Sequence, residues 1–182
     1  IDFPVYLDLS LLGDDFWNNV DGSGDDIRVT NGDGQTELPF DLVEFSTSTL
    51  SGELHFLADS LQSATDTLFY IYHNNQSATA YASSSPYGSQ AVWSGYEAVY
   101  HFNDDPSVVV YDQTGKGRNL LPAVGTAATT SGQLGTALDL TGGSIMIEDA
   151  DWTWQAGDDL ISSGWYFQST IDTGALWQFG DN

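Results

Sequence analysis

The feature that most constrains the fold of this chain is an alternation of apolar and polar residues with a period of two. Val5-Tyr6-Leu7-Asp8-Leu9 is a clear case, since every second side chain is apolar, as in a strand with one buried face. Strong helical patterns are absent, and only Asp14–Val20 predicts a short helix, with an Asp as its N-cap. The pattern predicts an all-β fold, with strands at residues 5–9, 27–30, 38–45, 53–57, 67–72, 98–102, 108–111, 137–140, 144–148, 160–167 and 175–179.

The strongest turn signal is the run Asn31-Gly32-Asp33-Gly34. Because Asn and Gly tolerate positive φ, this run predicts a hairpin between the strands at 27–30 and 38–45. Pro39 lies near the start of the second of these strands. Since proline has no backbone N–H, it predicts that this part of the strand lies at a sheet edge or a bulge.

The spacing of the strands predicts two jelly-roll-like β-sandwich units, at residues 1–78 and 92–182. Residues 79–91 are rich in Ser and Ala and predict a linker between them. Ile1 lies beside a predicted strand and the last strand ends close to Asn182, so we expect the second sandwich to be incomplete. An excerpt of a longer protein explains this best; the alternative is that neighbouring chains complete the sheets.

The charge of the chain excludes several classes of partner. There are 26 acidic residues against three Lys and Arg, a formal net charge of -23. Nucleic acid is excluded as a partner because phosphate binding needs clustered cations, and docking on an anionic membrane is disfavoured. The absence of cysteine excludes disulfides and thiolate metal sites, and no apolar run is long enough to span a membrane. The excess of carboxylates favours cation binding, with calcium as the expected ion.

One acidic segment has the ligand spacing of a calcium loop. Asp21, Ser23 and Asp25 provide oxygen side chains at loop positions 1, 3 and 5, but the Gly expected at position 6 is Asp26. The alternative is an acidic turn that needs Asx and Gly residues only for its geometry. Both interpretations stay open at this level.

Aromatic residues give a second set of candidates. Trp152 and Trp154 are two residues apart and so point to one face of a strand, which makes either a sugar-stacking platform or part of the core. Trp93 lies beside the predicted linker and is the aromatic residue least clearly assigned to a core. His55, His73 and His101 lack the close spacing of a zinc pair and are expected to be structural.

Two stretches resemble known families. The first covers about residues 1–90 and is similar to a domain of unknown function in exported bacterial and archaeal proteins, through Phe3-Pro4-Val5, Asp15-Phe16-Trp17, Gly24-Asp25-Asp26-Ile27-Arg28-Val29-Thr30, Glu37-Leu38-Pro39-Phe40 and Thr67-Leu68-Phe69-Tyr70-Ile71-Tyr72. That family commonly closes its last strand with Tyr-Gly-Asn, whereas this chain has Tyr72-His73-Asn74-Asn75, where an Asn takes the left-handed turn.

The second stretch covers about residues 92–182 and resembles the first part of a concanavalin-like laminin-G domain. The resemblance is carried by Val92-Trp93-Ser94-Gly95-Tyr96-Glu97-Ala98-Val99-Tyr100-His101-Phe102, Asp112-Gln113-Thr114-Gly115-Lys116-Gly117, Gly135-Thr136-Ala137-Leu138-Asp139-Leu140-Thr141-Gly142 and Ile161-Ser162-Ser163-Gly164-Trp165. It implies an extracellular, cell-surface or periplasmic location. It also implies a calcium site at Asp112 and the carbonyls around Gly115.

These features predict a non-catalytic interaction module that binds a glycan or a cell-surface partner. The alternatives are a structural spacer or filament subunit that assembles through open sheet edges, and the periplasmic part of a TolQ/MotA-type proton-channel protein. An enzyme is not expected. Glu148-Asp149-Ala150-Asp151 lacks the Glu-x-Asp-x-Glu order of concanavalin-like glycosidases, and no nucleophile elbow or phosphate loop occurs.

Overall fold

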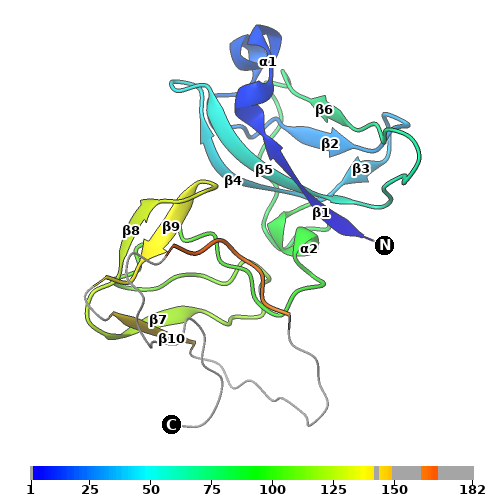
Figure 1. Ribbon diagram of the computed structural model, residues 1–182. Helices are drawn as coiled ribbons and strands as arrows, with labels where there is room; N and C mark the ends of the chain where they lie inside the picture. The colour runs from blue at the N-terminus through cyan, green and yellow to red at the C-terminus, as the bar shows by residue number, and fades with distance from the viewer. Residues whose placement is uncertain (1, 142–143, 149–160, 168–182) are drawn as a thin grey trace. The chain divides into compact units, whose positions relative to one another are not determined.

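The computed structural model describes residues 2–141, 144–148 and 161–167 (Figure 1). The chain divides into two compact units, Ile1–Trp152 and Thr153–Asn182. Small antiparallel sheets account for most of the regular structure in the first unit, so the predicted all-β class is confirmed. Of the second unit only residues 161–167 are described, and they form no strand, unlike the prediction for this segment.

Two three-stranded sheets organise the first 72 residues (Figure 1). One, called here the long sheet, has the order β1 (Phe3–Asp8), β5 (Ser51–Ala58) and β4 (Phe40–Ser46). The other, called the short sheet, has the order β3 (Glu37–Leu38), β2 (Arg28–Thr30) and β6 (Tyr70–Tyr72). All neighbouring strands run antiparallel, and β1, β4, β3 and β6 form the sheet edges.

Pro39 lies at the point where the chain leaves the short sheet and enters the long one. The sequence predicted one strand over 38–45, but the structure ends β3 at Leu38 and begins β4 at Phe40. Because proline lacks an N–H, it cannot donate to a ladder. Its carbonyl still accepts a hydrogen bond from the Leu57 N–H at 3.0 Å. The expected irregularity at Pro39 is therefore a change of sheet.

The predicted hairpin joins β2 to β3. Val29 lies opposite Leu38, and the Asn31 N–H donates to the Thr36 carbonyl at 3.0 Å. Gly34 has a φ of +70°, in the left-handed region that favours glycine. After β6 the chain turns at Asn74, whose φ of +69° matches the left-handed turn expected there.

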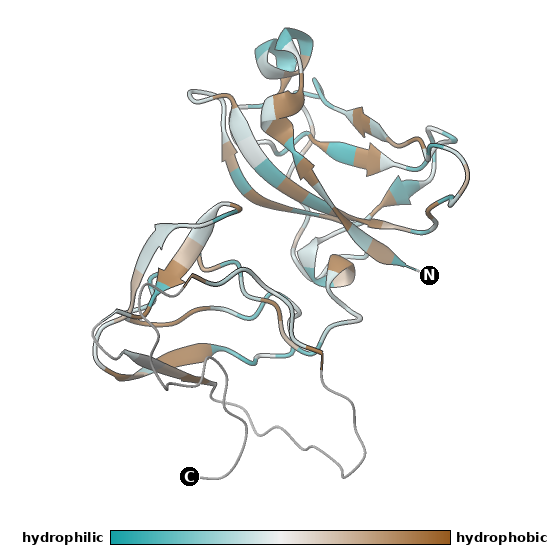
Figure 2. Cartoon of the chain, viewed as in Figure 1, coloured by the Kyte–Doolittle hydropathy of each residue, from teal (hydrophilic) through white to brown (hydrophobic). Residues whose placement is uncertain are grey.

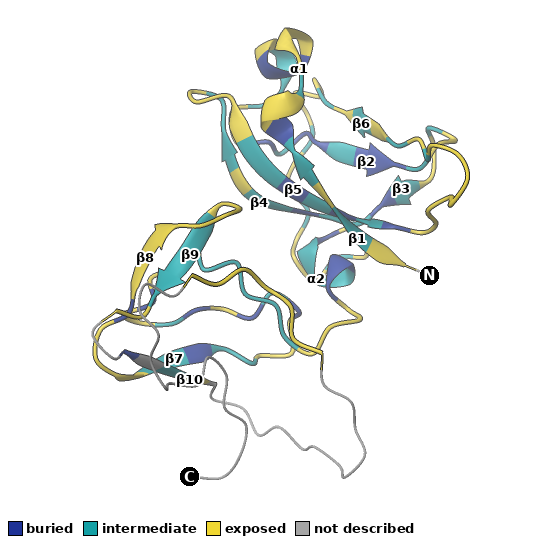
Figure 3. Ribbon diagram, viewed as in Figure 1, coloured by how far each residue is buried: buried dark blue, intermediate teal, exposed yellow. Residues whose placement is uncertain are grey.

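A single apolar core cluster lies between these elements (Figure 2, Figure 3). Helix α1 (Asp14–Asn19), which follows the 3-10 turn η1 (Leu9–Leu11), contributes Phe16 and Trp17. The helix is confirmed, but its N-cap is Gly13 and not an Asp, and no side chain caps it. The indole of Trp17 stacks on Phe45 with ring centres 5.5 Å apart. The buried members are Leu9, Phe16, Trp17, Ile27, Val29, Leu38, Leu54, Phe56 and Ala58.

Residues 79–91 contact both sheets. The Phe40 N–H donates to the Tyr87 carbonyl at 3.2 Å, and the guanidinium of Arg28 lies 4.2 Å from the centre of the Tyr81 ring. Helix α2 (Ser89–Val92) begins within this segment and buries Val92. The limits of the two sandwich units remain predictions.

The remaining strands form two hairpin-sized sheets. One pairs β7 (Leu120–Val124) with β10 (Ile145–Glu148), and the other pairs β8 (Ala128–Ser131) with β9 (Thr136–Asp139). The predicted strands at 137–140 and 144–148 are thus confirmed as β9 and β10. No strand forms at 98–102 or 108–111; Val110 makes only an isolated bridge to Leu120. Among the described residues, no helix is long and apolar enough to cross a membrane.

We predict that Leu54→Ala lowers the free energy of unfolding by about 2–5 kcal/mol, because it removes a fully buried side chain from the core. Urea unfolding followed by circular dichroism measures this change. Leu11→Ala is the matched control, since Leu11 is 78% exposed and its loss is expected to change stability by less than about 0.5 kcal/mol. Equal effects of the two substitutions would contradict the placement of the core.

Candidate functional site

The segment predicted as a calcium loop is an acidic turn held by its own hydrogen bonds. The Asp21 carboxylate accepts from the Ser23 N–H at 2.9 Å and from the Ser23 hydroxyl at 2.6 Å. These bonds hold the pKa of Asp21 below its usual value. The Asp25 carbonyl accepts from the Arg28 guanidinium at 2.9 Å. The geometry thus favours the turn interpretation for Asp21, Ser23 and Asp25.

Asp26 is the structural residue of this turn, and the sequence analysis missed its role. It is 2% exposed, and its carboxylate accepts from the Asp21 N–H at 3.0 Å. Its other oxygen accepts from the Asn74 N–H at 2.6 Å and the Asn75 N–H at 3.2 Å. Asp26 therefore joins the acidic turn to the left-handed turn after β6. Position 6 of the supposed calcium loop is a buried hydrogen-bond acceptor.

Asp112 and Gly115, the second predicted calcium site, also form a turn. One carboxylate oxygen of Asp112 accepts from the N–H groups of Val99 (3.1 Å) and Thr114 (3.0 Å). The other accepts from the Thr114 hydroxyl (2.6 Å) and the Arg118 N–H (3.3 Å). Gly115 follows with a φ of +76°. Both oxygens of this buried carboxylate are therefore already engaged in hydrogen bonds within the protein.

The pKa of Asp112 follows from the same contacts. Burial alone raises the pKa of a carboxyl group, but hydrogen bonds from Thr114, Val99 and Arg118 outweigh burial here and lower it. Across the described residues no group of three or more His, Asp or Glu side chains is arranged to hold a metal ion.

Trp93 is buried and belongs to a polar cluster on the long sheet. It is 6% exposed, so its ring is packed within the protein, unlike the exposed ring that sugar stacking requires. Its indole N–H donates to an oxygen of Asp41 at 2.7 Å, and the His101 Nε2 donates to the same oxygen at 2.8 Å. Trp152 and Trp154, the other two predicted ligand residues, lie outside the described residues.

His55 and Glu53 complete this group. We call it the histidine cluster, and its members are Asp41, Glu53, His55, Trp93 and His101. His55 lies opposite Asp41 in the β4–β5 pairing and donates from Nε2 to Glu53 at 2.8 Å. The His55 and His101 rings stack with centres 5.7 Å apart. Imidazoles and carboxylates are the usual groups of acid–base catalysis, but here each Nε2 is bound to a carboxylate and the side chains are 10–14% exposed. The cluster holds chain segments together.

An open depression lies where the hairpin turn meets the loop before β6. It has a volume of about 280 Å³. The turn contributes Asn31, Gly32 and Asp33 to the lining, and the loop between β5 and β6 contributes the other lining residues. The lining therefore includes carboxylate, amide and hydroxyl groups. The loop residues are Asp59, Ser60, Gln62, Asp66, Thr67, Leu68 and Phe69.

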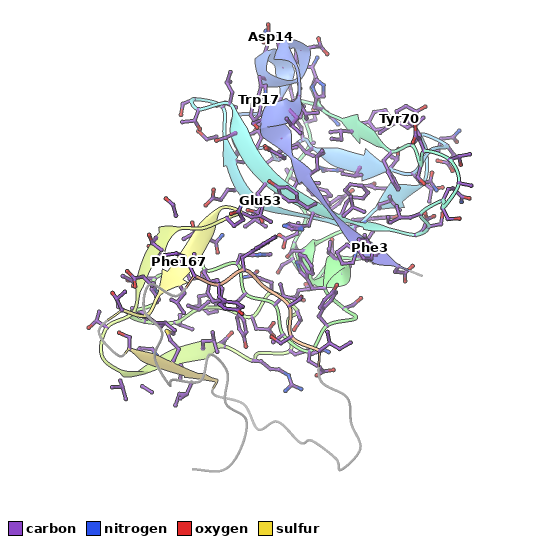
Figure 4. All side chains as sticks on the ribbon, viewed as in Figure 1. Phe3, Asp14, Trp17, Glu53, Tyr70 and Phe167 are labelled. Carbon is purple, nitrogen blue, oxygen red and sulfur yellow. The ribbon has the colours of Figure 1, made fainter. Side chains whose placement is uncertain are left out.

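Two exposed tyrosines are the first and last residues of β6. The first of them, Tyr70, is labelled in Figure 4. Tyr70 is 41% exposed and Tyr72 is 47% exposed, while Ile71 between them packs against the core. The Tyr72 hydroxyl donates to the Gly34 carbonyl at 2.9 Å. A Cβ atom at Gly34 would lie 3.1 Å from that hydroxyl and 3.8 Å from the Tyr70 ring, so both rings lie against the turn.

We call the depression together with Tyr70 and Tyr72 the tyrosine face. The sequence predicted a strand at 67–72 and a turn at 31–34, but no local pattern predicted that the two meet. The available signal was the Tyr-x-Tyr spacing beside an Asp-rich loop. Periodicity alone does not tell which face of such a strand is solvent-exposed.

All three cationic side chains of the protein are engaged in ion pairs. Arg28 lies 3.6 Å from Glu37, Lys116 lies 3.2 Å from Glu97, and Arg118 lies 2.9 Å from the other oxygen of Glu97. The depression is lined instead by three aspartates and by neutral residues. The tyrosine face is therefore an acidic and aromatic surface.

Comparisons with protein-family models, with curated proteins and with solved structures find no match to this chain. The resemblance to an exported domain and to a laminin-G-like domain therefore remains a sequence-based expectation. A function has to be inferred from the geometry of the described residues.

We predict that Asp112→Asn lowers the free energy of unfolding by about 1–3 kcal/mol at neutral pH, because an amide has one acceptor oxygen in place of two. The folded carboxyl has a lowered pKa, so its contribution is present above the unfolded pKa and is lost as the pH falls. The difference in free energy of unfolding between the wild type and Asp112→Asn should thus become smaller in acid. Urea unfolding at several pH values measures this difference.

Asp105→Asn is the control for Asp112, since it makes the same change in a turn where, among the described residues, the Asp105 carboxylate accepts only from Ser107. We expect calcium to leave the melting temperature of the wild type unchanged. A calcium-dependent rise that Asp112→Asn abolishes would contradict the turn interpretation.

We predict that Asp41→Ala destabilises the protein by about 1–3 kcal/mol for each donor left without an acceptor, namely Trp93 and His101. Tryptophan fluorescence during urea unfolding measures the loss. Glu44→Ala, on the same strand, removes an exposed carboxylate and is expected to change stability by less than about 1 kcal/mol. If Asp41→Ala unfolds at the same urea concentration as the wild type, the histidine cluster contributes nothing to stability.

Proposed function

We propose that this chain is a non-catalytic interaction module that binds glycan chains outside the cytoplasm through its tyrosine face. The observation that carries the proposal is the exposed pair Tyr70 and Tyr72 beside an open depression lined by carboxylate, amide and hydroxyl groups. This combination suits a ligand that is apolar on its ring faces and polar around its rim.

The chemistry of the tyrosine face matches that of a sugar chain. The C–H face of a pyranose packs on an aromatic ring, and its hydroxyl groups bond to carboxylates and amides. Tyr70 and Tyr72 are alternate residues of one strand, so their Cα atoms are about 7 Å apart and their side chains point to the same side. Successive units of an extended chain can therefore contact both rings while a third unit reaches the depression.

Binding without catalysis is supported by where the titratable groups lie. The histidines of the histidine cluster are largely buried and hydrogen-bonded to Asp41 and Glu53. The tyrosine face has no histidine among its described residues. Its depression is open to solvent, which suits holding a polymer more than enclosing a reaction.

The proposed location outside the cytoplasm rests on the composition and on the resemblance to exported domains. A chain with a net charge of -23 is suited to a salty environment, where screening weakens self-repulsion.

The test is retention of the purified chain on a panel of insoluble polysaccharides, with calcium and then with EDTA. We expect retention on at least one, and a loss of about ten-fold or more in apparent association constant for Tyr70→Ala/Tyr72→Ala, the size expected for two aromatic contacts. We expect the same retention in EDTA, because Asp21 and Asp112 are engaged in internal hydrogen bonds.

Tyr111→Ala is the matched control, since Tyr111 is 53% exposed and is not one of the residues that line the depression. Failure of the wild type to bind any polysaccharide would overturn the proposal. A sedimentation coefficient that increases with protein concentration would then favour assembly through the sheet edges.

A further inference from the structure

The charge lining the depression selects among glycans. Three of its residues, Asp33, Asp59 and Asp66, are acidic, and all three are exposed. The cations of the chain are paired elsewhere, Arg28 with Glu37 and the other two with Glu97. An anionic glycan, such as one built from uronic acids or sulfated sugars, would meet repulsion here with no cation to offset it.

The three carboxylates are held differently. Asp33 accepts from the N–H groups of Thr36 and Gln35 and from the Thr36 hydroxyl, and these bonds lower its pKa, so it keeps its negative charge into acid. Asp59 has one long contact, 3.5 Å, from the Ser60 hydroxyl. None of the ion pairs formed by the described residues includes Asp59 or Asp66, so both can pair with an incoming cation.

The aromatic part of the site favours the same ligand. Tyr70 and Tyr72 lie beside the depression, and a cation next to the face of a tyrosine ring is attracted by its π electrons. A sugar that carries an ammonium group can therefore stack one ring on a tyrosine and place its charge near Asp59 or Asp66. A neutral sugar makes only the first of these contacts.

We infer that the glycan bound at the tyrosine face is cationic, an amino-sugar polymer with free amine groups. The inference rests on the proposed function, because it specifies the ligand of the same site. Long-range attraction by the whole acidic chain adds to the on-rate, while Asp59, Asp66 and the two tyrosines give the site its selectivity.

The experiment compares one polymer in two charge states: polyglucosamine beads and the same beads after N-acetylation of their amines. The sugar backbone is unchanged, while each amine loses its charge and gains an acetyl group. We expect retention of the wild-type chain to be about ten-fold stronger on the amine form and to weaken as salt is raised from about 0.05 to 0.5 M. Asp59→Asn/Asp66→Asn should weaken it about three- to ten-fold, the size expected for losing two exposed ion pairs.

The matched control is Asp2→Asn/Asp14→Asn, which removes the same charge from exposed residues that do not line the depression. It should retain the wild-type affinity. Equal weakening by both double variants would show attraction by net charge alone and overturn the inference. Equal retention on acetylated beads would also overturn it, while leaving the proposed function standing. No retention on either bead or on any polysaccharide of the panel would overturn both.

Discussion

The carboxylate of Asp41 accepts hydrogen bonds from Trp93 and His101, and these bonds hold the segment after α2 against the long sheet. A buried carboxylate is unfavourable unless it is paired and hydrogen-bonded, so Asp41 requires both partners. The partners are separated from it by 52 and 60 residues. The contact therefore fixes the path of a long stretch of chain that has little regular structure of its own. Glu53 and His55 extend the same network along β5.

The long sheet has two faces of opposite character because its strands alternate with a period of two. One face buries Leu54 and Phe56 in the core. On the other, Tyr6, His55 and Asp41 form one row across the three strands, and Asp8, Glu53 and Glu44 form the next. Three carboxylates in a row repel one another, and the bonds from His55 to Glu53 and from Thr136 to Glu44 offset part of that repulsion. The polar face thus needs donors from other parts of the chain.

The alternation predicted the strands of the first 72 residues well, because there the backbone is held by ladders that follow local pattern. It failed at 98–102 and 108–111, where side chains provide part of the backbone's hydrogen bonding and the backbone–backbone bonds are isolated. Asp112 accepts from the Val99 N–H, and the Tyr100 hydroxyl donates to the Arg118 carbonyl. Such contacts depend on the register between distant segments, which no periodicity encodes. For the same reason Trp93 looked free in the sequence, although its partner Asp41 was visible as a polar position on a predicted strand.

In the candidate site, too, the local turn could be predicted from the sequence, whereas its contact with a distant strand could not. The turn at residues 31–36 was predictable, since Asn31 and Gly34 favour its backbone conformation. Its position against Tyr70 and Tyr72 was not, because it depends on Arg28 lying opposite Tyr72 and Thr30 opposite Tyr70 in the β2–β6 pairing. That pairing places an edge strand with exposed rings next to a turn stiffened by Asp33. A binding surface built on a turn and an edge strand needs little reorganisation when a ligand arrives, since the Tyr72 hydroxyl is already anchored to Gly34. The three Lys and Arg side chains pair with Glu37 and Glu97, so the other surface carboxylates of the described residues, including those beside this turn, have no Lys or Arg in an ion pair with them.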